Sequence, residues 1–193
     1  MSERLGVFGG TFDPVHLGHL RAAECARVDA RLDTVLFLPS GQPPHRPGPL
    51  APAFDRYAMV SLATAGHGAF VPSELELRRE GPSYTVDTLR ALRGQHPRAT
   101  LFLVLGSDAF SEMGSWHQAA LVAAEATVVV IERPGQAALP APALPGLQAV
   151  HVQAAGLPVS SSEVRRLRAE GRSVRYLVPD AVADYIEKKE LYR

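Results

Sequence analysis

The chain has 193 residues, which is enough for one compact domain with a sizeable buried core. Twenty Lys and Arg residues balance twenty Asp and Glu residues, so the formal net charge is zero. This excludes broad electrostatic attraction to nucleic acid or to an anionic membrane surface, and any phosphate group must be held at a local site.

The sequence favours a cytoplasmic protein without a membrane segment. Its first residues, Met-Ser-Glu-Arg, lead into a strand-like stretch and lack the pattern of a signal peptide. No apolar run approaches the roughly 18 residues that a membrane span needs. Cys25 is the only cysteine, so an intramolecular disulfide and a multi-cysteine metal site are excluded. We expect Cys25 to be a small buried core residue.

Short apolar runs alternate with helical patterns along the chain. In order, we expect a strand at 5–8, a helix at 16–28, a strand at 34–38, a proline-rich loop at 39–52, a helix at 53–65, an extended segment at 70–77, a helix at 84–92, strands at 101–105 and 127–131, a second proline-rich loop at 134–145, a strand at 150–153, and helices at 160–169 and 180–188. This alternation predicts an α/β fold, namely a Rossmann-like, doubly wound parallel sheet with helices on both faces, in a single domain spanning residues 1–193. In such sheets, ligands bind outside the carboxyl ends of the strands.

The strongest functional signal is the sequence GGTFDPVHLGH, which follows the first expected strand. Gly9 and Gly10 allow a ligand to approach the backbone closely, because they carry no Cβ. The helix that follows offers unpaired N–H groups and a positive dipole end to a phosphate group. His16 and His19 are three residues apart and share one helix face, which Gly18 keeps open. Histidines at this place can donate hydrogen bonds to triphosphate oxygens and stabilise charge in a transition state.

Two other interpretations of this motif are open. It can be a tight turn in which one histidine caps the helix and the other packs. Asp13, His16 and His19 can also form a zinc site, although the adjacent glycines suit phosphate better than metal.

The longer sequence GGTFDPVHLGHL resembles the N-terminal signature of the HxGH nucleotidyltransferase superfamily, and specifically that of the bacterial nicotinate-mononucleotide adenylyltransferases. Four further stretches are similar to motifs of the narrower family, in the same order: PPHR at 43–46, PSYT at 82–85, Gly106-Ser107-Asp108 followed by Trp116, and VSSSEVR at 159–165. The C-terminal residues 185–193 are also similar. The resemblance covers nearly the whole chain, and the ordered set is specific where the first motif alone indicates only the superfamily.

The resemblance implies that ATP is bound by residues of the first and last motifs, with His16 and His19 as the catalytic pair. The implied ATP-binding residues are Gly9, Gly10, Thr11, Phe12, His16, His19, Ser160, Ser161 and Arg165. His16 and the turn at 9–11 would face the α-phosphate, and His19, Ser161 and Arg165 would face the β- and γ-phosphates.

The last motif also has a purely structural interpretation. Ser160 and Glu163 fit a capping box, and Arg166 is an alternative to Arg165 as the phosphate contact. Val159 and Ser162 stand where the family usually has Ile and Thr, and Ser162 keeps the hydroxyl group.

For the second substrate, the resemblance implies contacts with Arg46, Tyr84, Thr85, Asp108 and Trp116. Groups around Tyr84 and Thr85 would meet the pyridine carboxylate, and Trp116 would stack on the pyridine ring. Each contact has an alternative: Trp116 can be a core residue, Asp108 a turn residue, and Arg46 a solvated loop charge. Ser83 can cap the helix that follows it, and Arg133 is a weaker candidate for a phosphate contact.

The implied reaction converts ATP and nicotinate mononucleotide to nicotinate adenine dinucleotide and pyrophosphate, as a step of NAD biosynthesis. The attacking phosphate is already anionic, so no general base is needed. Mg²⁺ is expected to be held mainly by triphosphate oxygens and water, with no cage of protein ligands. The alternatives are another adenylyl- or cytidylyltransferase of the superfamily, for example one acting on phosphopantetheine, a nucleotide-binding sensor, and an interaction protein. The sequence leaves the oligomeric state open.

Overall fold

The computed structural model describes residues 2–44, 50–132, 139–154 and 157–193. The strands are β1 (Arg4–Gly10), β2 (Thr34–Pro39), β3 (Phe70–Pro72), β4 (Thr100–Gly106), β5 (Thr127–Glu132) and β6 (Ala149–Gln153). The helices are α1 (Leu17–Asp29), α2 (Ala53–Thr64), α3 (Thr85–Gln95), α4 (Ser107–Glu112), the 3-10 helix η1 (Met113–Ser115), α5 (Ala119–Glu125), α6 (Ser161–Ala169) and α7 (Asp180–Lys188).

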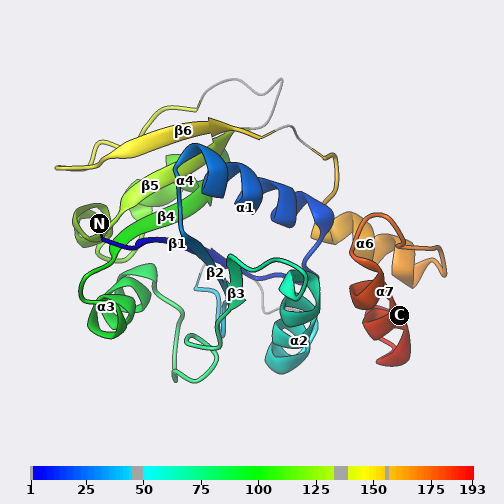
Figure 1. Ribbon diagram of the computed structural model, residues 1–193. Coiled ribbons are helices and arrows are strands. Elements are labelled where there is room, and N and C mark those ends of the chain that lie inside the picture. Colours follow the sequence, from blue (N-terminus) through cyan, green and yellow to red (C-terminus); the bar gives the residue numbers. More distant parts are fainter. Residues whose placement is uncertain (1, 45–49, 133–138, 155–156) are drawn as a thin grey trace.

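The described strands form one parallel sheet in the order β3-β2-β1-β4-β5-β6. The chain starts in the middle of the sheet, winds outwards to β3, returns to β4 beside β1, and winds outwards again to β6 (Figure 1). The predicted doubly wound parallel sheet is confirmed. Its topological switch point lies between β1 and β4, where ligands bind in folds of this kind.

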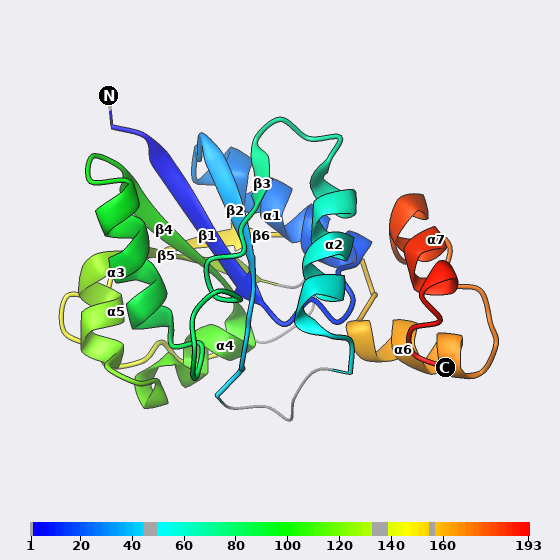
Figure 2. The ribbon, with the colours of Figure 1, turned by 90° about the horizontal axis from the view of Figure 1, so that it is seen from below.

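The central strands are apolar on both faces because helices cover both sides of the sheet. In β2, Val35 and Phe37 pack into one buried cluster, and Leu36 and Leu38 pack into the other. This alternation has the period of two that a strand requires. Helix α1 lies on the first face (Figure 1), whereas α3 and α5 lie side by side on the second (Figure 2).

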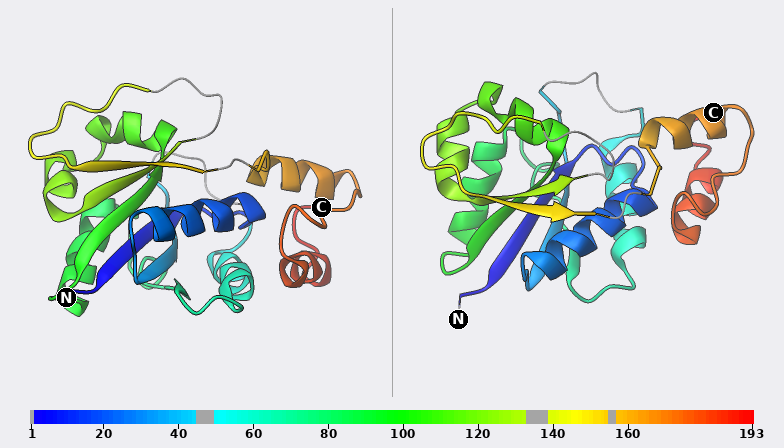
Figure 3. Two further views of the ribbon diagram at one scale, coloured as in Figure 1. Left: turned by 45° about the horizontal axis from the view of Figure 1, so that its top comes forward. Right: turned by 90° about the horizontal axis from the view of Figure 1, so that it is seen from above.

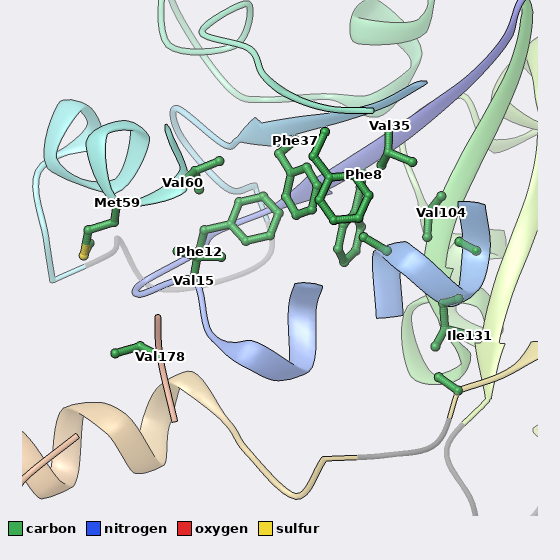
Figure 4. Close-up of a cluster of buried hydrophobic side chains, with 14 of the residues drawn as sticks. Phe8, Phe12, Val15, Val35, Phe37, Met59, Val60, Val104, Ile131 and Val178 are labelled. Atoms are coloured by element: carbon green, nitrogen blue, oxygen red, sulfur yellow. The ribbon is translucent and has the colours of Figure 1, made fainter. Parts of the chain in front are cut away.

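The first cluster continues past the sheet and holds the C-terminal helices against the first motif. Phe12 and Val15 of the loop after β1, Met59 and Val60 of α2, and Val178 ahead of α7 lie together in this cluster (Figure 4). Helices α6 and α7 extend beyond the end of β6 at one side of the sheet (Figure 3). The last residues of the chain are therefore packed near the residues that follow its first strand.

Two parts of the sequence prediction are wrong or incomplete. The segment 70–77 was expected to be extended, but β3 ends at Pro72 and the chain then turns, with the backbone N–H groups of Leu77 and Arg78 both bonded to the carbonyl of Glu74. Helices α4 and α5 were not predicted, because their six and seven residues are too short for a clear helical period. Cys25 is buried, as expected. No helix within the described ranges is both long and apolar enough to cross a membrane.

Candidate active site

Helix α1 begins in the first motif, and a histidine caps it. His16 is the N-cap residue, and its Nδ1 accepts a hydrogen bond from the backbone N–H of His19 at 3.3 Å. In return, Nδ1 of His19 accepts the backbone N–H of His16 at 3.2 Å. This reciprocal pair has the form of a capping box, with histidines in place of the usual serine and glutamate.

The two imidazole rings are stacked, with their centroids 3.6 Å apart and their planes inclined by 26°. Because each Nδ1 accepts a hydrogen bond, each neutral ring carries its proton on Nε2. His16 is buried and His19 is half-buried. The cap uses Nδ1 of each ring, so capping does not by itself exclude a role of these histidines in phosphate binding.

Residues around the pair hold the rings in place. Phe12 is buried with φ at 49°, and its ring lies edge-on to His19 at a centroid distance of 5.1 Å. A Cβ on Gly18 would lie 3.0 Å from Nδ1 of His16, and one on Gly10 would lie 3.1 Å from the Phe12 ring. Any contact of Phe12 with ATP would thus come from its backbone. By contrast, no described atom lies within 4 Å of where a Cβ of the exposed Gly9 would be.

Asp13 has a structural role that sequence reasoning missed. Its buried carboxylate accepts hydrogen bonds from the backbone N–H groups of Leu50 (2.8 Å) and Ala51 (3.1 Å) and from the Tyr192 hydroxyl (2.7 Å). Burial is the main cause that raises the pKa of Tyr192 well above its ordinary value, and the hydrogen bond to Asp13 adds to it. Asp13 therefore ties the first motif to the segment before α2 and to the C-terminus.

The described residues contain no group of three His, Cys, Asp or Glu side chains that could hold a metal ion. Of the three residues considered for a zinc site, Asp13 already uses its carboxylate for three hydrogen bonds.

Arg56 in α2 is a second residue that the sequence analysis missed. It is fully buried, and its guanidinium group donates to the backbone carbonyls of Thr11 and Ser40, each at 2.7 Å, and of Ala51 at 3.3 Å. Burial lowers the pKa of Arg56, and the Asp13 carboxylate opposes this shift. The available signal was its helical spacing of three and four residues from Met59 and Val60, which puts a charge on the buried face.

The start of α6 lies against the first motif. The Ser161 hydroxyl donates to the carbonyl of Pro14 at 2.9 Å, and Nη1 of Arg165 donates to the carbonyl of Asp13 at 2.7 Å. Ser160 is the N-cap of α6, and its hydroxyl accepts the backbone N–H of Glu163 at 3.1 Å.

Arg165 and Arg166 of α6 point to different surroundings. Arg165 contacts the loop after β1, whereas Nη1 of Arg166 bonds both carboxylate oxygens of the exposed Glu170 at 2.9 Å. The structure thus brings Arg165, and not Arg166, to the first motif.

The PSYT segment leads into α3, but Ser83 does not cap that helix. Tyr84 is the N-cap residue and makes no side-chain capping bond. The Ser83 hydroxyl instead accepts the backbone N–H groups of Gly41 (2.9 Å) and Gln42 (3.3 Å), which follow β2. The expectation that Ser83 can cap α3 is therefore wrong, because α3 begins at Thr85 and the hydroxyl bonds a different loop.

The motif of Gly106-Ser107-Asp108 and Trp116 follows β4, on the other side of the switch point. Asp108 is exposed in the first turn of α4, and Trp116 is half-buried against the second apolar cluster at the end of η1. The ring centroid of His117, the residue after Trp116, lies 4.3 Å from that of Tyr84, so the PSYT segment contacts the chain next to Trp116. Arg46 and Arg133, also considered as phosphate contacts, lie outside the described residues.

These motifs define a nucleotide-binding α/β fold whose candidate site lies at the switch point between β1 and β4. Residues 7–167 match the cytidylyltransferase-like family, and the chain belongs to that family. A protein of Thermus thermophilus named probable nicotinate-nucleotide adenylyltransferase is 48% identical over 190 residues, which cover 98% of this chain and 100% of that protein. A protein of the same name from Pelobacter propionicus is 43% identical over 211 aligned positions, covering 98% of each chain.

Solved structures agree on the fold. The nicotinic acid mononucleotide adenylyltransferase of Plasmodium falciparum complexed with NaAD matches with a TM-score of 0.80 and 19% identity, over 98% of this chain and 97% of that one. The same enzyme complexed with APC matches with a TM-score of 0.78. The family match and the full-length relatives confirm the resemblance inferred from the motifs.

Proposed function

We propose that this protein transfers the adenylyl group of ATP to nicotinate mononucleotide, releasing pyrophosphate and forming nicotinate adenine dinucleotide for NAD biosynthesis. The relatives that carry this activity in their names extend over the whole chain at 40–48% identity. The observation that carries the proposal is the meeting of two segments far apart in the sequence: the histidine-capped start of α1 and the Ser161–Arg165 side of α6.

The chemistry needs alignment and charge neutralisation more than proton transfer. The phosphate of nicotinate mononucleotide is the nucleophile, and it attacks the α-phosphorus of ATP as the bond to the β-phosphate bridging oxygen breaks. We propose that the Nε2–H groups of His16 and His19 donate to phosphate oxygens whose charge grows during this exchange. Holding two anionic phosphates in line supplies much of the remaining acceleration.

The other proposed ATP contacts surround this pair. Gly9 and Gly10 end β1, and Thr11 and the backbone of Phe12 follow in the loop that leads to α1. Ser161 and Arg165 would face the departing β- and γ-phosphates, because Arg165 has N–H donors beyond the two that bond Asp13 and Ser162.

We propose that Mg²⁺ enters with ATP, held by triphosphate oxygens and water, where it would neutralise charge on the leaving pyrophosphate. The donor set of the described residues fits this arrangement better than a protein cage, since Asp13 is committed to hydrogen bonds. The chain's own part is to present N–H donors around the triphosphate.

The pyridine nucleotide would lie on the β4 side of the site. We propose that the start of α3 at Tyr84 and Thr85 binds the nicotinate carboxylate with backbone N–H groups. Trp116 would stack on the ring, and Asp108 and Arg46 would contact the rest of the nucleotide. Both substrates are small nucleotides rather than nucleic acid, and we propose the cytoplasm as the compartment because ATP is one of them.

The test is pyrophosphate release by the purified protein with Mg²⁺, ATP or CTP, and a panel of phosphorylated acceptors. We expect release with ATP and nicotinate mononucleotide together, and little with phosphopantetheine or without an acceptor. Faster release with phosphopantetheine or with CTP would assign the chain to another activity of the superfamily. Nucleotide binding without turnover on any acceptor would indicate a sensor.

A further inference from the structure

A buried carboxylate lies outside the groups used above. Glu76 is 7% exposed, in the turn that follows β3. Burial raises its pKa, while hydrogen bonds from Thr88 and Ser83 and the charge of Arg79 oppose that shift. Burying an acid is unfavourable unless its oxygens are well bonded, so these partners indicate what Glu76 holds in place.

On one side, Glu76 holds α3. The Thr88 hydroxyl, one turn inside α3, donates to Oε1 of Glu76 at 2.7 Å. Nη2 of Arg79 donates to the Thr88 hydroxyl oxygen at 3.2 Å and reaches the carbonyl of Tyr84 at 3.5 Å. The buried acid and the arginine therefore fix the first turn of the helix that begins with the PSYT segment.

On the other side, Glu76 holds the loop after β2. The Ser83 hydroxyl opposes the rise in the pKa of the Glu76 carboxyl, and it accepts the backbone N–H groups of Gly41 and Gln42. The backbone of Ser83 also donates to the carbonyl of Gln42 at 2.9 Å. A Cβ on Gly41 would lie 2.7 Å from the carbonyl oxygen of Glu76, so only glycine allows this close approach.

The two segments joined in this way both belong to the proposed pyridine-nucleotide side. Tyr84 and Thr85 start α3, and residues 41–42 lead directly into the PPHR sequence. The proposed ATP contacts lie on β1, α1 and α6, and none of the hydrogen bonds described for Glu76 involves them. Resting on the proposed function, we propose that Glu76 is a positioning residue that fixes both segments through Ser83 and Thr88 and so sets the affinity for the pyridine nucleotide.

Glu76→Gln tests this, because it keeps the shape of the side chain but replaces one acceptor oxygen with an NH₂ group that cannot accept the Ser83 or Thr88 proton. We expect the KM for nicotinate mononucleotide to rise about tenfold, the effect of losing one hydrogen bond to a charged group. The KM for ATP should stay within about twofold of the wild-type value, as the ATP contacts are untouched.

Glu74→Gln is the matched control. It makes the same chemical change two residues earlier, where the Glu74 carboxylate pairs with Arg78 at the surface at 2.6 Å. Surface pairs of this kind contribute little, so both KM values should stay at the wild-type level. Equal effects of the two substitutions would overturn the proposal, as would an equal rise of both KM values in Glu76→Gln.

Ser83→Ala supplies a second arm that does not depend on the stability of the Glu76 variant. It should raise the KM for nicotinate mononucleotide and leave the KM for ATP unchanged. In the double variant Glu76→Gln/Ser83→Ala, the rise in KM should be smaller than the product of the two single effects. A wild-type KM in Ser83→Ala, or independent effects in the double variant, would overturn the proposal. A wild-type protein that makes no dinucleotide would instead refute the proposed function, so the two failures are distinguishable.

Discussion

The two histidines of α1 combine a structural and a chemical role, and single substitutions can separate them. Nδ1 of His16 caps the helix, whereas its Nε2 carries the proton that we assign to catalysis. At the same scale, Arg165 and Arg166 are chemically equal and one residue apart, yet only Arg165 contacts the loop after β1.

His16→Asn should abolish most turnover while keeping the helix cap, because the amide oxygen of Asn is a good N-cap acceptor. We expect kcat to fall by about 10²–10³, the usual effect of losing one preorganised donor, with the melting temperature close to that of the wild type. His16→Ala should lose the same turnover and also about 1 kcal/mol of stability, because it removes the cap. Near-normal kcat in the Asn variant would remove His16 from the mechanism.

Arg165→Ala should chiefly raise the KM for ATP, because a β/γ-phosphate contact is largely present in the ground state as well. We expect a rise of about tenfold, as for one charge-assisted hydrogen bond. Arg166→Ala is the control, since its guanidinium pairs with Glu170 in solvent. Steady-state kinetics with ATP varied compare the two, and an equal response of both variants would contradict the assignment.

Two tyrosines hold the C-terminal segment against the rest of the fold. Tyr192 donates to Asp13 of the first motif, and Tyr185 of α7 donates to Asp55 of α2 at 2.6 Å. Burial is the main cause that raises the pKa of Tyr185 to about 12, and the hydrogen bond to Asp55 adds to it. Helix α7 is therefore joined both to α2 and, through the chain end, to the ATP side of the candidate site.

The contribution of the Tyr185 bond should depend on pH with a definite sign. Because the folded pKa is raised above the ordinary value of about 10, the stabilisation is fully present below pH 10 and is lost as pH rises towards 12. The difference in unfolding free energy between the wild type and Tyr185→Phe should be constant from about pH 7 to 9 and then shrink. A difference that grows above pH 10 would contradict the sign.

Element prediction from the sequence succeeded where a segment's own pattern decides its structure. Every buried residue of β2, β4 and β5 is apolar, so these continuous apolar runs indicate buried strands without ambiguity. It failed at 70–77, because the turn there depends on the burial of Glu76 against α3 and the loop after β2. Asp13 and Tyr192 could not be placed for the same reason: their partners lie 37 to 179 positions away, and no local pattern indicates them. For Arg56, the helical spacing indicates burial but not the backbone carbonyls of Thr11 and Ser40 that it binds.

In the whole molecule, the switch point between β1 and β4 separates two sets of binding groups. Helix α1, which His16 caps, and the start of α6 lie on one side. Trp116 and the contact between the rings of Tyr84 and His117 lie on the other. The resemblance to the family implied which groups belong together, and the parallel sheet explains why the motifs meet. We therefore expect the choice of pyridine nucleotide to be decided on the β4 side, by residues other than the histidines that act on the phosphates.

This separation predicts a preference for nicotinate over nicotinamide mononucleotide. The amide NH₂ would face the N–H donors at the start of α3 and leave them unpaired, so we expect kcat/KM to differ by about 10⁴. Trp116→Ala should lower kcat/KM for both nucleotides and keep their ratio, since a ring stacks equally well in either form. Equal use of both by the wild type would refute the carboxylate argument, and a lost preference in Trp116→Ala would assign discrimination to the tryptophan.

The most direct test of adenylyl transfer at this site follows the label from ATP. With ATP labelled at the α-phosphate and nicotinate mononucleotide as acceptor, all transferred label should appear in the dinucleotide. With ATP labelled at the γ-phosphate, the label should appear only in pyrophosphate, in equal amount to the dinucleotide formed. Label from the γ-phosphate on the acceptor, or pyrophosphate release without a labelled dinucleotide, would contradict the account.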